Sequence, residues 1–210
     1  MKRQILIFLV SFVIATFCSI ARAQETPTPN CVYDRARMLA LDENQFDQDM
    51  KGGWRALSST PGCNLAAADL LREYREAHHQ TSGLLFWHEA QLRAFSGQYR
   101  EAITLMEHSY KPADADKAGW NPYVDATIAF LRKDKPALEQ AKSRLAIVPP
   151  PTGDKDMGPV VDGYMEVKFI DGTTRKIRWP MNIDVVDGLE NCFDKSYTEA
   201  YENTCRQGAH

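Results

Sequence analysis

Three of the five histidines lie within the short stretch "YREAHHQTSGLLFWHEAQ", residues 74–91. His78 and His79 are expected to end one helix, and His88 lies early in the next helix after a "TSG" turn. A helical hairpin of this kind could bring one of the first two imidazoles near His88. Imidazole and carboxylate are zinc ligands. One hypothesis is therefore a metal-binding protein or metal-dependent enzyme centred on His78, His79, His88 and Glu89.

The local spacing argues against that chemistry. A zinc protease needs His-Glu-x-x-His on one helical face, whereas Leu92 occupies the position of the second histidine. His78 and His79 would point about 100° apart on a helix, an arrangement that rarely lets both bind one ion. We therefore interpret the stretch as a polar network between helices and expect no catalytic residue, metal or cofactor. Its candidate binding residues are His79, Trp87, His88 and Glu89.

A second group of residues could recognise acidic chemistry. Basic side chains cluster in a short predicted hairpin of a chain whose formal net charge is −3. They could bind an acidic protein, a lipid headgroup or peptidoglycan carboxylates. Charged side chains also protect strand edges from aggregation. The residues in this candidate surface are Lys168, Arg175, Lys176 and Arg178.

The N-terminus resembles a secretory signal. Lys2 and Arg3 precede an apolar run over residues 5–20, and residues 21–23 form a small-x-small cleavage site. Cleavage after Ala23 would leave 22 basic and 28 acidic residues, a formal net charge of −6. Such a chain disfavours nucleic acid as a partner. We expect a periplasmic or secreted protein with no membrane span in its mature chain.

Four cysteines remain after the predicted cleavage, because Cys18 is removed with the signal. An even number in an oxidising compartment predicts two disulfides with three possible connectivities. We favour the sequence-local connectivity, because each bond then closes a loop of modest length. These bonds are Cys31–Cys63 and Cys192–Cys205.

Behind a mobile leader at residues 24–30, residues 31–148 read as an array of helices separated by short breaks. A helix over 32–50 and a break over 52–63 come first. The apolar spacing then predicts helices over 65–79, 84–95, 99–110, 123–132 and 136–148. Helices joined by short connections pack as antiparallel neighbours. The expected fold is mainly α, an array of antiparallel helical hairpins with a small C-terminal β-hairpin and short helix.

The stretch Ala90–Ser109 resembles a tetratricopeptide repeat. Small, glycine, aromatic and aliphatic residues fall at the repeat's expected places, namely Ala90, Gly97, Tyr99, Ala102 and Ile103. Residues 123–145 form a looser second match and residues 54–74 a third. The chain also resembles small secreted proteobacterial proteins of unknown function. The first resemblance implies a scaffold of paired helices. The second gives no indication of an activity.

A Pro-rich linker at residues 149–160 precedes a change to alternating apolar residues, and residues 161–210 are expected to dock on the helices. Val167 and Phe169 share one face of a strand, and Ile177 and Trp179 share one face of the next. Phe169 pairs with Ile177, and Val167 with Trp179, only across a loop longer than two residues. We therefore predict a bulged loop and a final helical segment.

These patterns favour an exported, non-enzymatic interaction scaffold whose partner is another protein or peptide of the cell envelope. Two alternatives remain open. One is the metal centre at the histidines. The other is an inhibitor or immunity-type protein that uses the loop at residues 171–174. The sequence leaves the oligomeric state open.

Overall fold

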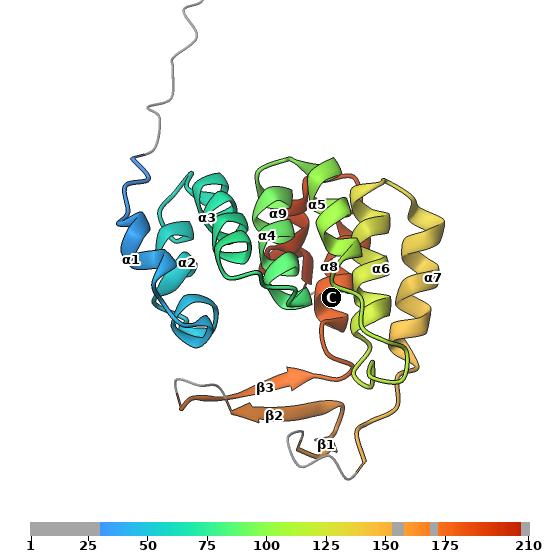
Figure 1. Cartoon of the computed structure of the whole chain (residues 1–210). Helices are drawn as coiled ribbons and strands as arrows, with labels where there is room; N and C mark the ends of the chain where they lie inside the picture. The colour runs from blue at the N-terminus through green and yellow to red at the C-terminus, as the bar shows by residue number, and fades with distance from the viewer. Residues whose placement is uncertain (1–29, 153–157, 169–171, 207–210) are drawn as a thin grey trace, which may run out of the picture.

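A computed structural model describes residues 30–152, 158–168 and 172–206 (Figure 1). Consecutive helices pack against one another and are followed by a small three-stranded antiparallel sheet and short helices. The mainly helical fold class is therefore confirmed. The predicted signal, all but the last residue of the leader and residues 153–157 of the linker lie outside the described residues.

The N-terminal part differs from the prediction. The helix expected over 32–50 is wrong: this region contains α1 (Arg35–Leu39) and a separate π-helical turn, η1 (Asn44–Gln48). The side chain of Asp34 accepts a hydrogen bond from the Arg37 amide, and that of Asp42 accepts one from the Gln45 amide. Each aspartate thus starts a new turn, because short polar side chains compete with continuous helix for backbone donors.

The break expected over 52–63 contains a further helix, α2 (Gly53–Ser58). Gly53 has a φ of +52°, and a Cβ placed there would lie 1.9 Å from the Phe46 carbonyl oxygen. Only glycine permits this close approach of backbone to backbone. The glycine that marked a break in the sequence therefore starts α2 directly against η1.

The remaining helices of the array lie close to their predicted positions, with α6 starting three residues early. At that helix the carboxylate of Asp116 accepts hydrogen bonds from the amides of Trp120 and Asn121, at 2.6 and 2.7 Å. These contacts satisfy amide donors that a helix leaves free at its start. The helices are α3 (Asn64–Ala77), α4 (Gly83–Phe95), α5 (Tyr99–Glu107), α6 (Trp120–Leu131) and α7 (Lys135–Ala146).

Two groups of buried apolar side chains hold the helices together. One group includes Phe46, Leu71 and Leu85 and joins η1 to α3 and α4. The other extends from Trp87 in α4 to the helices that follow the sheet, and includes Phe130 of α6. Each fully buried side chain of this size contributes about 1.5–3 kcal/mol. Packing of neighbouring helices is therefore the main source of stability.

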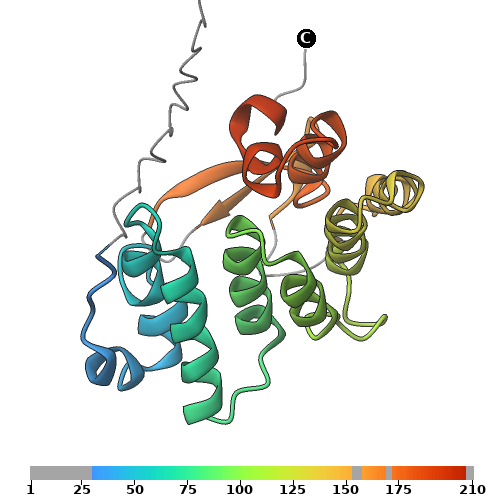
Figure 2. The same ribbon diagram turned by 90° about the horizontal axis from the view of Figure 1, so that it is seen from above.

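The chain's last helices lie on one face of the array (Figure 1 and Figure 2). Helix α8 (Ile183–Asn191) packs against α6 and α7, and α9 (Tyr197–Tyr201) packs against α4. The Tyr197 ring lies 5.1 Å from that of Phe95, and its amide donates to the Tyr99 hydroxyl at 3.2 Å. The protein's own C-terminal segment, whose last described element is α10 (Asn203–Arg206), thus covers part of α4 and α6.

Both predicted disulfides are confirmed. Cys31–Cys63 ties the segment before α1 to the start of α3. Cys192–Cys205 joins the end of α8 to α10. The two bonds are consistent with an oxidising, extracytoplasmic compartment.

The sheet has the order β1–β2–β3, with β1 at Val160–Val161, β2 at Tyr164–Lys168 and β3 at Thr174–Arg178. Strand β1 was not predicted. Its turn to β2 is Asp162–Gly163, where both residues have positive φ values of 50° and 78°. This geometry is that of a type I′ hairpin turn, which Asp-Gly favours.

The predicted register of the second hairpin is wrong. Ile177 pairs with Met165, not Phe169, and Val167 pairs with Arg175, not Trp179. The connection between the strands is therefore five residues long, and Met165, only 2% exposed, is the buried apolar partner. Phe169 itself lies outside the described residues.

The sheet is tied to the helices at one end. The Trp179 Nε1 donates to the Val148 carbonyl at 3.0 Å, just after α7. Arg178 pairs with Asp187 of α8 at 2.5 Å. Figure 1 shows the sheet extending from this attachment along one side of the helical array. The exposed side chains of β2 and β3 are thereby presented beside the helices.

Candidate functional site

Asp47 is the centre of the first polar cluster, although sequence reasoning did not select it. Its carboxylate is 1% exposed and lies in η1. It accepts hydrogen bonds from Trp54 Nε1 at 2.8 Å and Gln48 Nε2 at 2.5 Å, and contacts His88 Nδ1 at 2.6 Å. An Arg55 nitrogen lies 3.7 Å away. One buried carboxylate therefore joins η1, α2 and α4.

The electrostatics of this cluster favour a charged Asp47. Burial by itself opposes ionisation, but the hydrogen bonds from His88 and Trp54 and the charge of Arg55 outweigh it, so the pKa of Asp47 is lowered. The carboxylate in turn fixes the orientation of the His88 ring. These contacts make Asp47 and His88 a packed polar joint between helices.

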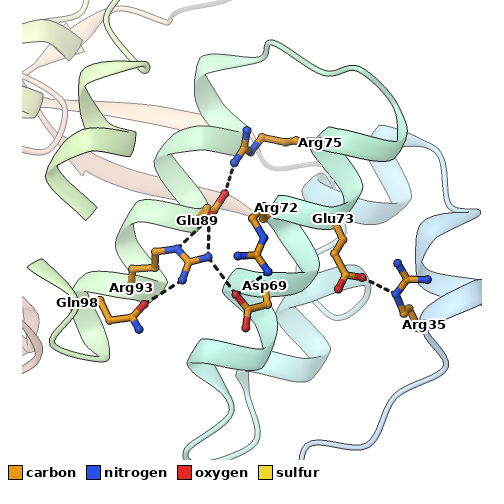
Figure 3. Close-up of polar contacts among 8 residues, drawn as sticks. All are labelled: Arg35, Asp69, Arg72, Glu73, Arg75, Glu89, Arg93 and Gln98. Carbon is orange, nitrogen blue, oxygen red and sulfur yellow. Dashed lines mark hydrogen bonds and ion pairs between the residues drawn. The ribbon is translucent and has the colours of Figure 1, made fainter. Parts of the chain in front are cut away.

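Glu89 forms the second cluster, in the middle of the array (Figure 3). It is 1% exposed and lies between Arg75 of α3 and Arg93 of its own helix. Arg93 also reaches Asp69 at 3.1 Å and Gln98 at 2.9 Å. Removing Glu89 would take away the buried counter-charge that Arg75 and Arg93 share. The cluster thus specifies how α3, α4 and the start of α5 fit together.

The histidines do not converge on one point. His78 Nε2 contacts the Leu39 carbonyl oxygen at 2.7 Å, and its ring lies 4.2 Å from that of Tyr74. His79 is exposed at the end of α3, with a φ of +51°. His88 is held by Asp47. Within residues 30–152, 158–168 and 172–206, no three His, Cys, Asp or Glu side chains gather as a metal site requires.

Trp87, another predicted binding residue, is 3% exposed and part of the core. Its ring lies 5.0 Å from that of Trp120 and 4.9 Å from that of Tyr123. Edge-to-face and tilted contacts at these distances are favourable aromatic packing. Trp87 therefore stabilises the joint between α4 and α6 and offers little surface to a ligand.

Three of the four basic residues, Lys168, Lys176 and Arg178, lie on one face of the second hairpin, whereas Arg175 lies on the opposite face with Val167. All four are exposed, and Arg178 is also paired with Asp187. Opposed residues of an antiparallel pair share a face, so Lys176 lies beside Glu166 and Arg178 beside Tyr164. Gly172 and Thr173 of the predicted inhibitory loop are described, whereas Asp171 lies outside the described residues.

A hollow of about 370 Å³ lies on the sheet face that carries Lys176. Its apolar lining includes Val161, which is 63% exposed, and Tyr164, which is 48% exposed. Glu166 and Lys176 line it as well. Sequence reasoning missed this hollow because it overlooked β1. The Asp-Gly pair at 162–163 was the available signal.

A second hollow, of about 550 Å³, lies between α1, η1 and α2. Val32, Met38 and Leu41 contribute its apolar lining, and Val32 is 80% exposed. Asp34 and Arg37 place opposite charges at the same hollow. Its lining therefore carries charges of both signs and favours neither an acidic nor a basic partner.

Comparison with family models, curated proteins and solved structures gave no significant match. A function for the surface therefore has to be argued from the geometry and charges of this molecule alone. No helix in the described part of the chain is long and apolar enough to cross a membrane.

Proposed function

We propose that this protein is a non-enzymatic interaction scaffold of the periplasm or extracellular space. In this proposal it holds another protein or peptide of the cell envelope on the exposed face of its C-terminal sheet. The observation that carries the proposal is the hollow at Val161 and Tyr164. Exposed apolar side chains beside charged ones, here Glu166 and Lys176, are typical of surfaces that bind proteins.

The arrangement of the helices supports this placement of the partner. An array of helical hairpins, which we propose to be tetratricopeptide-like, commonly offers an open face for binding. Here α8 and α9 cover part of that face at α6 and α4. The sheet projects beside the array and keeps its own outer face exposed, so it is the better candidate for contact.

The polar clusters support a non-enzymatic role. Asp47 and Glu89 are buried and engaged by donors from neighbouring helices. Side chains arranged in this way hold helices in register. The two disulfides support the proposed compartment, because such bonds persist under oxidising conditions.

Site-specific photocrosslinking tests the proposal. A photoreactive amino acid replaces Tyr164 in the full chain, and a matched control carries it in place of Ile147, which is 80% exposed after α7. In envelope fractions of the native cells, we expect a discrete crosslinked protein from position 164 and not from position 147. The change Val161→Asp should abolish it. Equal labelling from both positions, or none from position 164, would contradict the proposal.

A further inference from the structure

Strand β3 has a free edge whose backbone groups can be assigned. The Trp179 amide donates to the Gly163 carbonyl at 2.8 Å, which continues the register of β2 and β3 by one pair. In an antiparallel ladder, residues that hydrogen-bond to the partner strand alternate with residues that point away from it. Arg175, Ile177 and Trp179 therefore face β2 with their backbone groups.

It follows that the backbone N–H and C=O groups of Thr174, Lys176 and Arg178 point to the other side of β3. In the part of the sheet that the structure describes, β3 is the last strand on that side. These three residues are exposed. Within the described residues, three donors and three acceptors thus point outward along one edge, the arrangement to which an extended peptide adds as a new strand.

The charges at this edge indicate what kind of peptide fits. Among the described residues, Lys176 of β3 is exposed and has no ion-pair partner within 4.0 Å, although Glu166 lies opposite it on β2. Arg178 is paired with Asp187, so its charge is partly satisfied. The basic edge contrasts with a chain of net charge −3. Carboxylates on an added strand would lie next to Lys176 and experience a favourable field.

A second copy of this chain fits less well. If two β3 edges paired antiparallel about Lys176, that lysine would face its own counterpart, and basic residues would line both strands. Like charges directly opposite one another destabilise a pair of strands. Lysine on an edge strand is a usual protection against such self-association. The edge thus disfavours a copy of itself and favours an acidic partner.

We infer that the free edge of β3 binds an extended, acidic peptide segment of a partner protein as the fourth strand of the sheet. This inference rests on the proposed function and specifies the chemistry of its partner. Backbone groups at positions 174, 176 and 178 supply the hydrogen bonds. Lys176, which lies on the edge strand itself, selects acidic side chains on the added strand. The hollow at Val161 and Tyr164 lies beyond β2 and contacts a different part of the partner.

The experiment uses the full chain with both disulfides and a fluorescent peptide of eight residues that alternates glutamate and threonine. We expect saturable binding by fluorescence anisotropy, at least about tenfold weaker for Lys176→Glu and about twofold weaker or less for Lys135→Glu. Lys135 is an exposed lysine at the start of α7 and serves as the matched control. A peptide that alternates lysine and threonine should not bind.

Hydrogen exchange on the unaltered protein provides a test that does not depend on any variant folding. Peptide binding should slow exchange of the Lys176 and Arg178 amides at least about tenfold and leave the Ile177 amide unchanged, because that amide already faces β2. Equal binding of the lysine peptide, or unchanged exchange at Lys176 and Arg178, would overturn the inference. If crosslinking at position 164 persists in that case, the proposed function stands and only the strand-addition inference fails.

Discussion

Replacing Asp47 with alanine should destabilise the protein strongly, because its carboxylate is the shared acceptor of a buried cluster. A hydrogen bond to a charged group contributes about 1.5–3 kcal/mol, and a buried donor left without a partner costs about 1–3 kcal/mol. Trp54 would lose its acceptor in a site that is 8% exposed, and His88 would lose its contact. His88 and Arg55 retain some access to water, which limits the cost. We therefore expect a loss of about 3–5 kcal/mol in the free energy of unfolding.

Urea denaturation followed by tryptophan fluorescence and circular dichroism measures this loss. The control is Asp114→Ala in the loop before α6, where the side chain is exposed and the change should stay within about 0.5 kcal/mol. The slope of the unfolding free energy against urea concentration should be similar for the unaltered protein, Asp47→Ala and Asp114→Ala. A loss below about 1 kcal/mol for Asp47→Ala would refute the reasoning, because the cluster would then not stabilise the fold.

The same comparison has a predicted pH dependence. The folded state lowers the pKa of Asp47 below its ordinary value of 3.8, so its contribution to stability is complete above that pH. The contribution is lost as the pH falls through the lower, folded pKa. The difference in unfolding free energy between the unaltered protein and Asp47→Ala should therefore shrink as the pH is lowered from 4 toward 2. A difference that stays constant or grows over this range would contradict the assignment.

Three further comparisons test other joints of the fold by denaturation. Cys31→Ser should lower the free energy of unfolding by roughly 2–4 kcal/mol, and Cys205→Ser should lower it by less. A disulfide that closes a longer loop constrains the unfolded chain more, and the two bonds span 32 and 13 residues. The reverse order of the two losses would contradict this account. Glu89→Gln should cost about 2–4 kcal/mol, since Arg75 and Arg93 lose their buried counter-charge. Glu73→Gln is its control and should cost under about 1 kcal/mol, because the partner Arg35 is 62% exposed. Gly188→Ala should lower the free energy of unfolding by about 1–3 kcal/mol, since a Cβ there would lie 2.7 Å from the Ala200 carbonyl oxygen. Its control is Gly158→Ala, where the atom nearest to an added Cβ is at 3.5 Å, and that change should be nearly neutral.

The helices from residue 64 onward could be predicted because their signals are local. Apolar spacing and the turn residue Gly97, which has a φ of +78° in the structure, are both visible in the sequence. The N-terminal part could not be predicted in the same way. Gly53 indicates a break by its type alone, and only its contact with Phe46 makes it the start of a helix. Tertiary contact thus overrides local preference there.

The candidate site was predictable in composition but not in arrangement. His88 and Glu89 were recognised as polar groups between helices, yet the partner of His88 is Asp47, 41 residues earlier. No local spacing encodes a contact over that separation. In the sheet, apolar alternation around Phe169 pointed to the wrong register because Met165 supplies the buried partner instead. The hollow at Tyr164 depends on a two-residue strand that is too short to leave a periodic pattern.

The covering of α4 and α6 by the last helices has a consequence for the order in which the protein folds. The Tyr197 amide bonds to Tyr99 across 98 residues, and Gln91 reaches Tyr201 across 110. Contacts between residues so far apart in the chain form late, because a long loop must close before these contacts can stabilise the fold. The array therefore cannot complete the packing around Phe95 and Phe130 until α9 has been synthesised. A chain that ends before α9 would leave these aromatic rings exposed and prone to aggregation.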